Sequence, residues 1–245
     1  MAVELGANTS KKFLHRGVPG NERLTALSDG VFAIAITLLV LELRVPEQLP
    51  QGGLITLVPE LLPRVIGHAV TFAVLGIYWV GHYNMFLHIK RHDRTLLWLN
   101  NLFLLFVAVM PFPTSLVVQH GSDRLALIVY AGTLMCAGLS LELIWLYATH
   151  DNHLVAHGLD PDLIAFVHRR ILLAPLMYLL AVVVSFASLT AAKLIFVIVV
   201  VAYIVPNPTD KYHHRQFQSA GNGSQEVASL VGQPQASSMD KEQTQ

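Results

Sequence analysis

Residues 23–43 read RLTALSDGVFAIAITLLVLEL, and this stretch decides the fold. From Leu24 onward it is mostly apolar over about 20 residues, the length that an α-helix needs to cross a bilayer. It is apolar on every side, whereas strands of an outer-membrane barrel alternate apolar and polar residues. Backbone groups in lipid must be paired within the protein, so the stretch predicts a transmembrane helix.

The rest of the chain repeats this pattern. Further apolar runs lie at 65–89, 95–118, 125–148, 171–189 and, shorter, at 191–206. Only 13% of the 245 residues are charged, against roughly 25% in a soluble domain. The sequence therefore predicts an all-α polytopic membrane protein whose six transmembrane helices occupy residues 23–207. Residues 1–22 are expected to be a cytosolic segment, and the Ser- and Gln-rich residues 208–245 a disordered cytosolic tail.

The basic residues near the ends of the spans predict the orientation. Cytosolic ends carry an excess of Lys and Arg. Eleven lie on one side, namely Lys11, Lys12, Arg16, Arg23, Lys90, Arg91, Arg94, Arg169, Arg170, Lys211 and Arg215. Four lie on the other, namely Arg44, Arg64, Arg124 and Lys193. We therefore expect a multi-pass protein of the plasma or inner membrane with both termini in the cytosol. The net charge of zero indicates no nucleic-acid partner.

An acidic residue, Asp29, lies inside the first span, six residues past Arg23. A carboxylate inside a span costs at least ~2.5 kcal/mol on insertion scales. Asp29 can instead be the cap of a helix that starts later, since Ser and Asp are good N-caps. In that case the apolar run 31–43 would be too short to span.

The residues around Asp29 resemble the TMEM175 family of potassium channels, in its bacterial form with six spans per subunit. The family motif is an arginine, three residues, then Phe-Ser-Asp. This chain has Arg23 and then Leu27-Ser28-Asp29, so a leucine replaces the phenylalanine. The likeness continues at Tyr78-Trp79, His82 and in 91–93, 99–106 and 111–114. Spans 1 to 3 match well, and spans 4 to 6 match mainly in pattern.

The resemblance implies a homotetramer around a central axis, with the first span of each subunit lining the pore. It also implies that apolar side chains form the constriction and that no re-entrant filter loop exists. The permeant ion would be potassium, the partner the lipid bilayer, and no cofactor would be needed. The family's constriction positions fall on Ile34, Leu38 and Leu41.

The residues themselves agree with a side-chain barrier. The sequence contains no TVGYG run of the kind that supplies filter carbonyls in other potassium channels. Ile34, Thr37, Leu38 and Leu41 share one helix face at i, i+3, i+4 and i+7. Four-fold rings of Ile and Leu would make a narrow, dry throat that serves as gate and filter. The alternative is that this face contacts lipid or other helices.

Depth in the membrane predicts a polar network. Asp29 lies six residues past Arg23, His82 eight before Lys90, and Asn100 six after Arg94. All three therefore lie roughly 9–12 Å inside the same end. Lipid offers no polar partners, so we expect contacts among Arg23, Ser28, Asp29, Trp79, His82 and Asn100 or Asn101. The network either braces the first helix and sets the pore width, or is a purely structural clasp.

The sequence leaves more than one role possible for several other polar residues. Glu142 can pair with Arg169 or Arg170, join the network or extend to the interface. Glu42 either forms an acidic ring at the outer mouth or pairs with Arg44. His88, His92, His150, His153 and His157 lie at cytosolic ends, but nothing fixes the three or four converging ligands of a zinc site, so none is expected.

The leading function is a passive potassium-preferring channel. The alternative is a proton-coupled transporter or proton-conducting channel that uses Asp29 and His82. An intramembrane enzyme is not expected, because no second carboxylate or Cys/His pair accompanies these two residues. A purely structural or sensory membrane protein remains a further alternative.

Overall fold

The structure is a computed structural model that describes residues 21–41, 43, 54–155 and 159–205. The chain divides into a unit of residues 1–202 and a unit of residues 203–245, and only 203–205 of the second are described. Most of the expected N-terminal segment 1–22, the whole tail 208–245 and Glu42 lie outside the described residues.

The described residues form an all-helical fold. Its helices are α1 (Asn21–Leu41), α2 (Val58–His88), α3 (Arg94–Val109), α4 (Pro111–Gln119), α5 (Arg124–Thr149), α6 (Pro161–Ser185) and α7 (Leu189–Ile204). Two 3-10 turns, η1 (Leu54–Leu57) and η2 (His150–Asn152), precede α2 and follow α5. The one β-type pairing among these residues is an isolated bridge between Ile89 and Val155.

The helices have the length that a bilayer requires. Five stretches are long and apolar enough to cross it: Glu22–Leu41, Leu61–His88, Arg94–Gln119, Arg124–Asn152 and Pro161–Ser185. A sixth apolar helix, Leu189–Ile204, is shorter. The 21 residues of α1 span about 31 Å, close to the thickness of a hydrocarbon core. The predicted all-α polytopic fold is confirmed.

Aspartates just outside the apolar runs set where three helices begin. Asp93 accepts a hydrogen bond from Leu96 N at 2.8 Å and caps α3. Asp123 caps α5 in the same way, and Asp160 caps α6, where Pro161 occupies the first helical position. A carboxylate at this position satisfies a backbone N–H that has no partner within the helix.

The start of α6 differs from the sequence-based expectation. Hydropathy predicts that the span begins at residue 171, because the charged residues Arg169 and Arg170 directly before it lower the local hydropathy. The helix begins ten residues earlier, at Pro161, so Arg169 and Arg170 lie inside α6. The cap at Asp160 decides the boundary, and the helix runs through His168, Arg169 and Arg170 although these residues are polar.

The span 95–118 is divided into α3 and α4 at Met110. Pro111 and Pro113 follow this residue, and prolines lack the N–H that a continuous helix would use. Pro175, by contrast, lies inside a continuous α6. A break therefore divides the third span, and the two short helices still add up to one membrane-length stretch.

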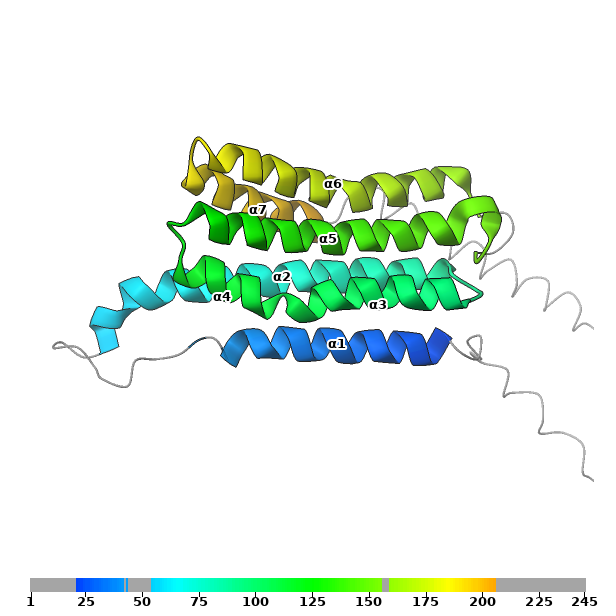
Figure 1. The fold of residues 1–245 in the computed structure, drawn as a ribbon, viewed down its shortest axis with the longest axis horizontal. Helices are drawn as coiled ribbons and strands as arrows, with labels where there is room; N and C mark the ends of the chain where they lie inside the picture. The colour runs from blue at the N-terminus through cyan, green and yellow to red at the C-terminus, as the bar shows by residue number, and fades with distance from the viewer. Residues whose placement is uncertain (1–20, 42, 44–53, 156–158, 206–245) are drawn as a thin grey trace, which may run out of the picture. The chain divides into compact units, whose positions relative to one another are not determined.

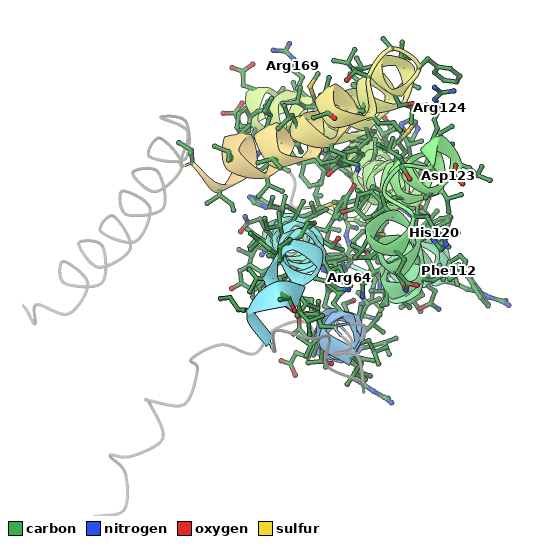
Figure 2. The ribbon with its side chains drawn as sticks, turned by 90° about the vertical axis from the view of Figure 1, so that its left-hand side faces the viewer. Arg64, Phe112, His120, Asp123, Arg124 and Arg169 are labelled. Carbon is green, nitrogen blue, oxygen red and sulfur yellow. The ribbon has the colours of Figure 1, made fainter. Side chains whose placement is uncertain are left out.

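Within residues 1–202, α1 lies at one edge of the bundle, beside α2 and the α3–α4 pair (Figure 1). α5 packs against α3 and α4 on one side and against α6 on the other. Figure 2 looks along the helices from the end where α4 meets α5, and shows α1 apart from α6. One side of α1 is consequently covered by its own subunit, and the other is not.

Two cations close helix ends at the α4–α5 turn. Arg124, labelled in Figure 2, donates to Ser185 O at 3.1 Å near the end of α6 and lies over the Phe186 ring. Lys193 donates to Gly121 O at 2.5 Å, just past the end of α4. Cations at helix C-termini satisfy terminal carbonyls and oppose the helix dipole.

Candidate functional site

α1 has two distinct faces. Leu24, Ser28, Phe32, Ala35 and Leu39, spaced by three or four residues, are buried against the neighbouring helices. Along the other side, Ile34 is 61% and Leu41 67% exposed in the single subunit. Leu38 and Thr37 lie on that side too. The four proposed pore residues therefore share a surface that their own subunit leaves uncovered.

Thr37 is the one polar member of this surface. Its hydroxyl donates within the helix, to Ala33 O at 2.9 Å or Ile34 O at 3.0 Å. Because the proton is used in this way, the hydroxyl oxygen keeps its lone pairs for a donor or a cation outside the helix. The side chain can thus offer an acceptor without breaking the helix.

Ser28, His82 and Asn100 form a buried chain of hydrogen bonds that joins α1, α2 and α3. His82 Nε2 lies 2.8 Å from Asn100 Oδ1, and Asn100 Nδ2 donates to Ser28 Oγ at 3.2 Å. Ser28 Oγ then donates to Leu24 O at 3.0 Å. Since an amide oxygen only accepts, His82 carries a hydrogen on Nε2. All three side chains are nearly fully buried and out of reach of water. These hydrogen bonds therefore satisfy polar atoms that would otherwise have no partner.

Aromatic rings enclose the His82 imidazole. Phe86 stacks on it at 4.2 Å between centroids and Phe103 at 5.5 Å, while Phe32 of α1 lies 6.4 Å away. Phe32 also contacts Phe103 at 5.8 Å. The rings hold the imidazole in one orientation, so the hydrogen bond to Asn100 is fixed by packing as well as by polarity.

Asp29 and Trp79 form a second link between α1 and α2. Trp79 Nε1 donates to Asp29 Oδ1 at 2.8 Å, and the indole stacks on Tyr83 at 6.0 Å. Both Asp29 and Trp79 are exposed in the single subunit. Asp29 lies inside α1, eight residues past its first residue, and is not a cap.

The remaining two candidates stand apart from these bonds. Arg23 and Asn101 are exposed, and neither forms a hydrogen bond or ion pair with another of the described residues. Within the described part of the chain, the polar site therefore consists of a buried chain through Ser28, Asn100 and His82, and an exposed pair, Asp29 and Trp79.

Glu142 has a partner that the sequence did not point to. It is buried on α5, and its Oε1 is hydrogen-bonded to His168 Nδ1 on α6. The sequence offers Arg169 and Arg170 as partners of Glu142, because both are expected in the loop between the fourth and fifth spans. With α6 starting at Pro161, His168 lies inside the helix and faces Glu142.

Sequence reasoning also missed a group of hydroxyls between α2, α4 and α5. Thr71 Oγ1 lies 3.0 Å from Tyr130 OH and 3.3 Å from Thr114 Oγ1. All three residues are buried. Isolated Thr and Tyr residues in apolar spans give no signal of their own, because the hydroxyl can bond to its own helix.

At the other end of the bundle, Asp93 ties the α2–α3 turn to the end of α5. Its Oδ2 accepts from Tyr147 OH at 2.5 Å and lies 3.3 Å from His153 Nε2. Burial raises the pKa of this carboxyl, but the hydrogen bonds from Leu96 N, Tyr147 and His153 and the charge of His153 bring the pKa below its ordinary value. Among the described residues no three His, Cys, Asp or Glu side chains gather as metal ligands.

Comparisons with known proteins match this arrangement. The family model described as "Endosomal/lysosomal potassium channel TMEM175" matches residues 23–111, which carry both polar links. A potassium channel of Streptomyces collinus is 35% identical over 170 residues, which are 68% of this chain and 82% of that relative. An endosomal/lysosomal proton channel TMEM175 of Bos taurus is 32% identical over 148 residues, 56% of this chain and 30% of that relative.

A solved structure shares the fold as well. The crystal structure of a lysosomal potassium-selective channel TMEM175 homolog from Chamaesiphon minutus superposes with a TM-score of 0.67 at 31% identity, covering 75% of this chain and 95% of that chain. The resemblance read from the motif is thereby confirmed: the chain belongs to the TMEM175 family of potassium channels and is a multi-pass membrane protein.

Proposed function

We propose that the protein conducts potassium passively through a pore on the axis of a homotetramer, lined by α1 of each subunit. The observation that carries this proposal is the uncovered apolar face of α1, with Ile34, Leu38 and Leu41 exposed in the single subunit. Lipid alone could cover such a face. Asp29, however, is exposed in the same helix, and acyl chains offer no partner to a carboxylate. Asp29 and Ile34 lie five residues apart, on different parts of the uncovered surface, so a neighbouring subunit and an aqueous axis together are better surroundings for this surface than lipid alone.

In this arrangement the Ile and Leu rings form the gate and the filter. An ion crosses a dry constriction only when it sheds part of its hydration shell or when the throat widens and wets. Potassium holds its water less tightly than sodium, so the constriction favours potassium. Thr37 adds a ring of hydroxyl oxygens beside the rings, where a partly dehydrated cation is stabilised.

The polar links act as a brace in this proposal. The Ser28–Asn100–His82 chain and the Asp29–Trp79 pair hold α1 at a fixed distance from α2 and α3. The pore width follows from that distance, because the constriction residues project from the same helix. With both termini in the cytosol, the brace lies near the inner end of the pore. An acidic ring at Glu42 would lie at the outer mouth.

The test is electrical recording of the purified protein in planar bilayers, with potassium and sodium on opposite sides. We expect currents without a coupled ion and a reversal potential that favours potassium. Mass measurement of the detergent-solubilised particle is expected to give four subunits. A particle of one or two subunits that still conducts would contradict the axial pore.

Proton conduction is the second candidate, because the Bos taurus relative is a proton channel by name and Asp29 is exposed on α1. Liposomes that enclose a pH-sensitive dye measure proton entry under a potassium-free gradient. Asp29→Asn and His82→Gln are expected to stop proton entry if these groups carry protons. Equal proton flux in both variants and in the parent protein would exclude this route.

A further inference from the structure

Glu142 is an acidic residue deep in the bundle, away from the α1 site. It lies seven residues before the end of α5, roughly 10 Å inside the bundle. Only 3% of the residue is exposed. Its partner, His168, lies seven residues past the start of α6, at the same depth and the same end. His168 is only partly covered, with 39% of its side chain exposed.

The hydrogen bond between the two side chains uses only one of the two carboxyl oxygens of Glu142. Glu142 Oε1 is hydrogen-bonded to His168 Nδ1, whereas the buried Oε2 has no hydrogen-bond partner among the described residues. A buried polar oxygen without a donor is unfavourable when neutral and much more so when charged. The site is therefore built around the state of this carboxyl group.

No other described charge compensates Glu142. On α6, Arg169 is exposed and Arg170 follows it, and neither is paired with the carboxylate. On the elements around α5, Asp93 and His153 bond to each other, His88 lies edge-on to Trp145, and His82 bonds to Asn100. Arg94 of α3 is exposed, and Lys193 of α7 donates to Gly121.

We propose that Glu142 and His168 form a proton-binding site inside the bilayer in every subunit, separate from the α1 site. With one proton, the pair is neutral overall, either as carboxyl and imidazole or as carboxylate and imidazolium. When that proton leaves, a carboxylate with an unbonded oxygen remains between α5 and α6.

Proton loss therefore weakens the packing of α6 on α5. Removing the compensation from a buried charge is strongly destabilising, and the binding of the proton is linked to folding stability. Because α1 packs on α2, α3 and α4, exchange at this site leaves the pore face in place.

The first experiment compares thermal unfolding of the full-length protein in detergent across pH for the parent protein and Glu142→Gln. We expect the parent protein to lose stability as the pH rises, in a step of one proton per subunit, and this step to be absent from Glu142→Gln. Asp162→Asn, which removes an exposed acid in the first turn of α6, is the matched control and should keep the step. Superimposable pH profiles of the parent protein and Glu142→Gln would overturn the proposal.

A second measurement covers the case in which Glu142→Gln does not fold. Histidines labelled with ¹⁵N are followed by NMR, and the His168 signal is assigned by its loss in His168→Gln. We expect this signal to shift with bulk pH in the parent protein in the same range as the stability step. A signal that does not respond to pH would overturn the proposal. Selectivity for potassium over sodium is expected to be unchanged in His168→Gln, so the outcome is independent of the proposed pore.

Discussion

The indole of Trp79 donates a hydrogen bond to the carboxylate of Asp29 at 2.8 Å, although both side chains are exposed on the single subunit. The bond joins α2 to α1 on the side of α1 that the subunit leaves uncovered. Acyl chains offer a carboxylate no hydrogen bond, so the indole N–H and whatever covers the pair in the assembly stabilise its charge. In the proposed tetramer, the pair therefore reports on how subunits assemble around α1.

Trp79→Phe is expected to weaken the proposed tetramer and lower the melting temperature. The substitution keeps an aromatic ring beside Tyr83 but removes the donor to Asp29, a loss of about 1 kcal/mol per subunit. Trp98→Phe is the control, because Trp98 is exposed on α3 and bonds to no described residue. Fluorescence-detected size exclusion after heating compares the two. An equal effect of both substitutions would mean that the Asp29 bond contributes nothing.

Asn100→Leu is expected to destabilise the fold by about 1–3 kcal/mol, because it leaves His82 Nε2 and Ser28 Oγ buried without their partner. Asn101→Leu is the matched control one residue away, since Asn101 is exposed and outside the network. Chemical unfolding in detergent measures both. If Asn101→Leu costs as much as Asn100→Leu, the buried chain of bonds is not what holds α1.

The sequence alone predicted the depth in the membrane at which the polar residues of the site lie. Counting residues from the basic ends placed Asp29, His82 and Asn100 in one layer, and the membrane argument says that such groups seek each other. Which atoms pair depends on helix rotation, and that is decided by packing. Phe86 and Phe103, apolar residues without a signal of their own, orient His82 toward Asn100.

The Glu142–His168 pair could not be predicted from hydropathy, because hydropathy misplaced the start of α6. The expected span from residue 171 leaves His168 in a loop, since His168 stands directly before Arg169 and Arg170. The boundary was set by Asp160 and Pro161, a cap signature that was present in the sequence but outside the apolar run. Reading caps before hydropathy would have extended the helix and placed His168 near Glu142.

Ile34→Ser and Leu38→Ser are expected to raise single-channel conductance and to lower selectivity for potassium over sodium. Either substitution replaces a dry ring with hydroxyls, so an ion keeps more of its water and the difference between the two ions shrinks. Val40→Ser is the control, because Val40 is also exposed on α1 but off the Ile34–Leu38–Leu41 face. Unchanged conductance and selectivity in both face variants would remove the pore assignment.

Protonation of Asp93 is expected to contribute to the loss of folding stability at low pH. Its folded-state pKa lies below the ordinary value, so its contribution is complete above about pH 3.9 and is lost as the pH falls through the lower folded value. Asp93→Asn is expected to lower stability at neutral pH by about 1 kcal/mol, because an amide still caps α3 but no longer offers Tyr147 and His153 a charged acceptor. The acid dependence of unfolding should also become shallower. The same acid profile in the variant and in the parent protein would show that other carboxylates set this limit.

Gly138→Ala tests the close approach of α5 to α6. A Cβ at this position would lie 2.7 Å from Pro175 Cγ and 3.1 Å from Tyr78 OH. The proline ring cannot rotate away, and Tyr78 is held by its hydrogen bond to Leu134 O at 2.7 Å. The helices must therefore separate, at a cost of about 1–3 kcal/mol.

Gly132→Ala is the matched control for this contact, because a Cβ at Gly132 of the same helix has no atom within 4 Å. Alanine there removes a flexible residue from a helix interior, so stability should be unchanged or slightly higher. Melting temperatures of the two variants in detergent decide the matter. Only the Gly138 substitution should lower the melting temperature and, because it moves α6 relative to Glu142 and His168, also shift the alkaline step described for that pair. A Gly138 variant with the melting temperature of the parent protein would mean that α5 and α6 are less tightly packed than the 2.7 Å approach requires.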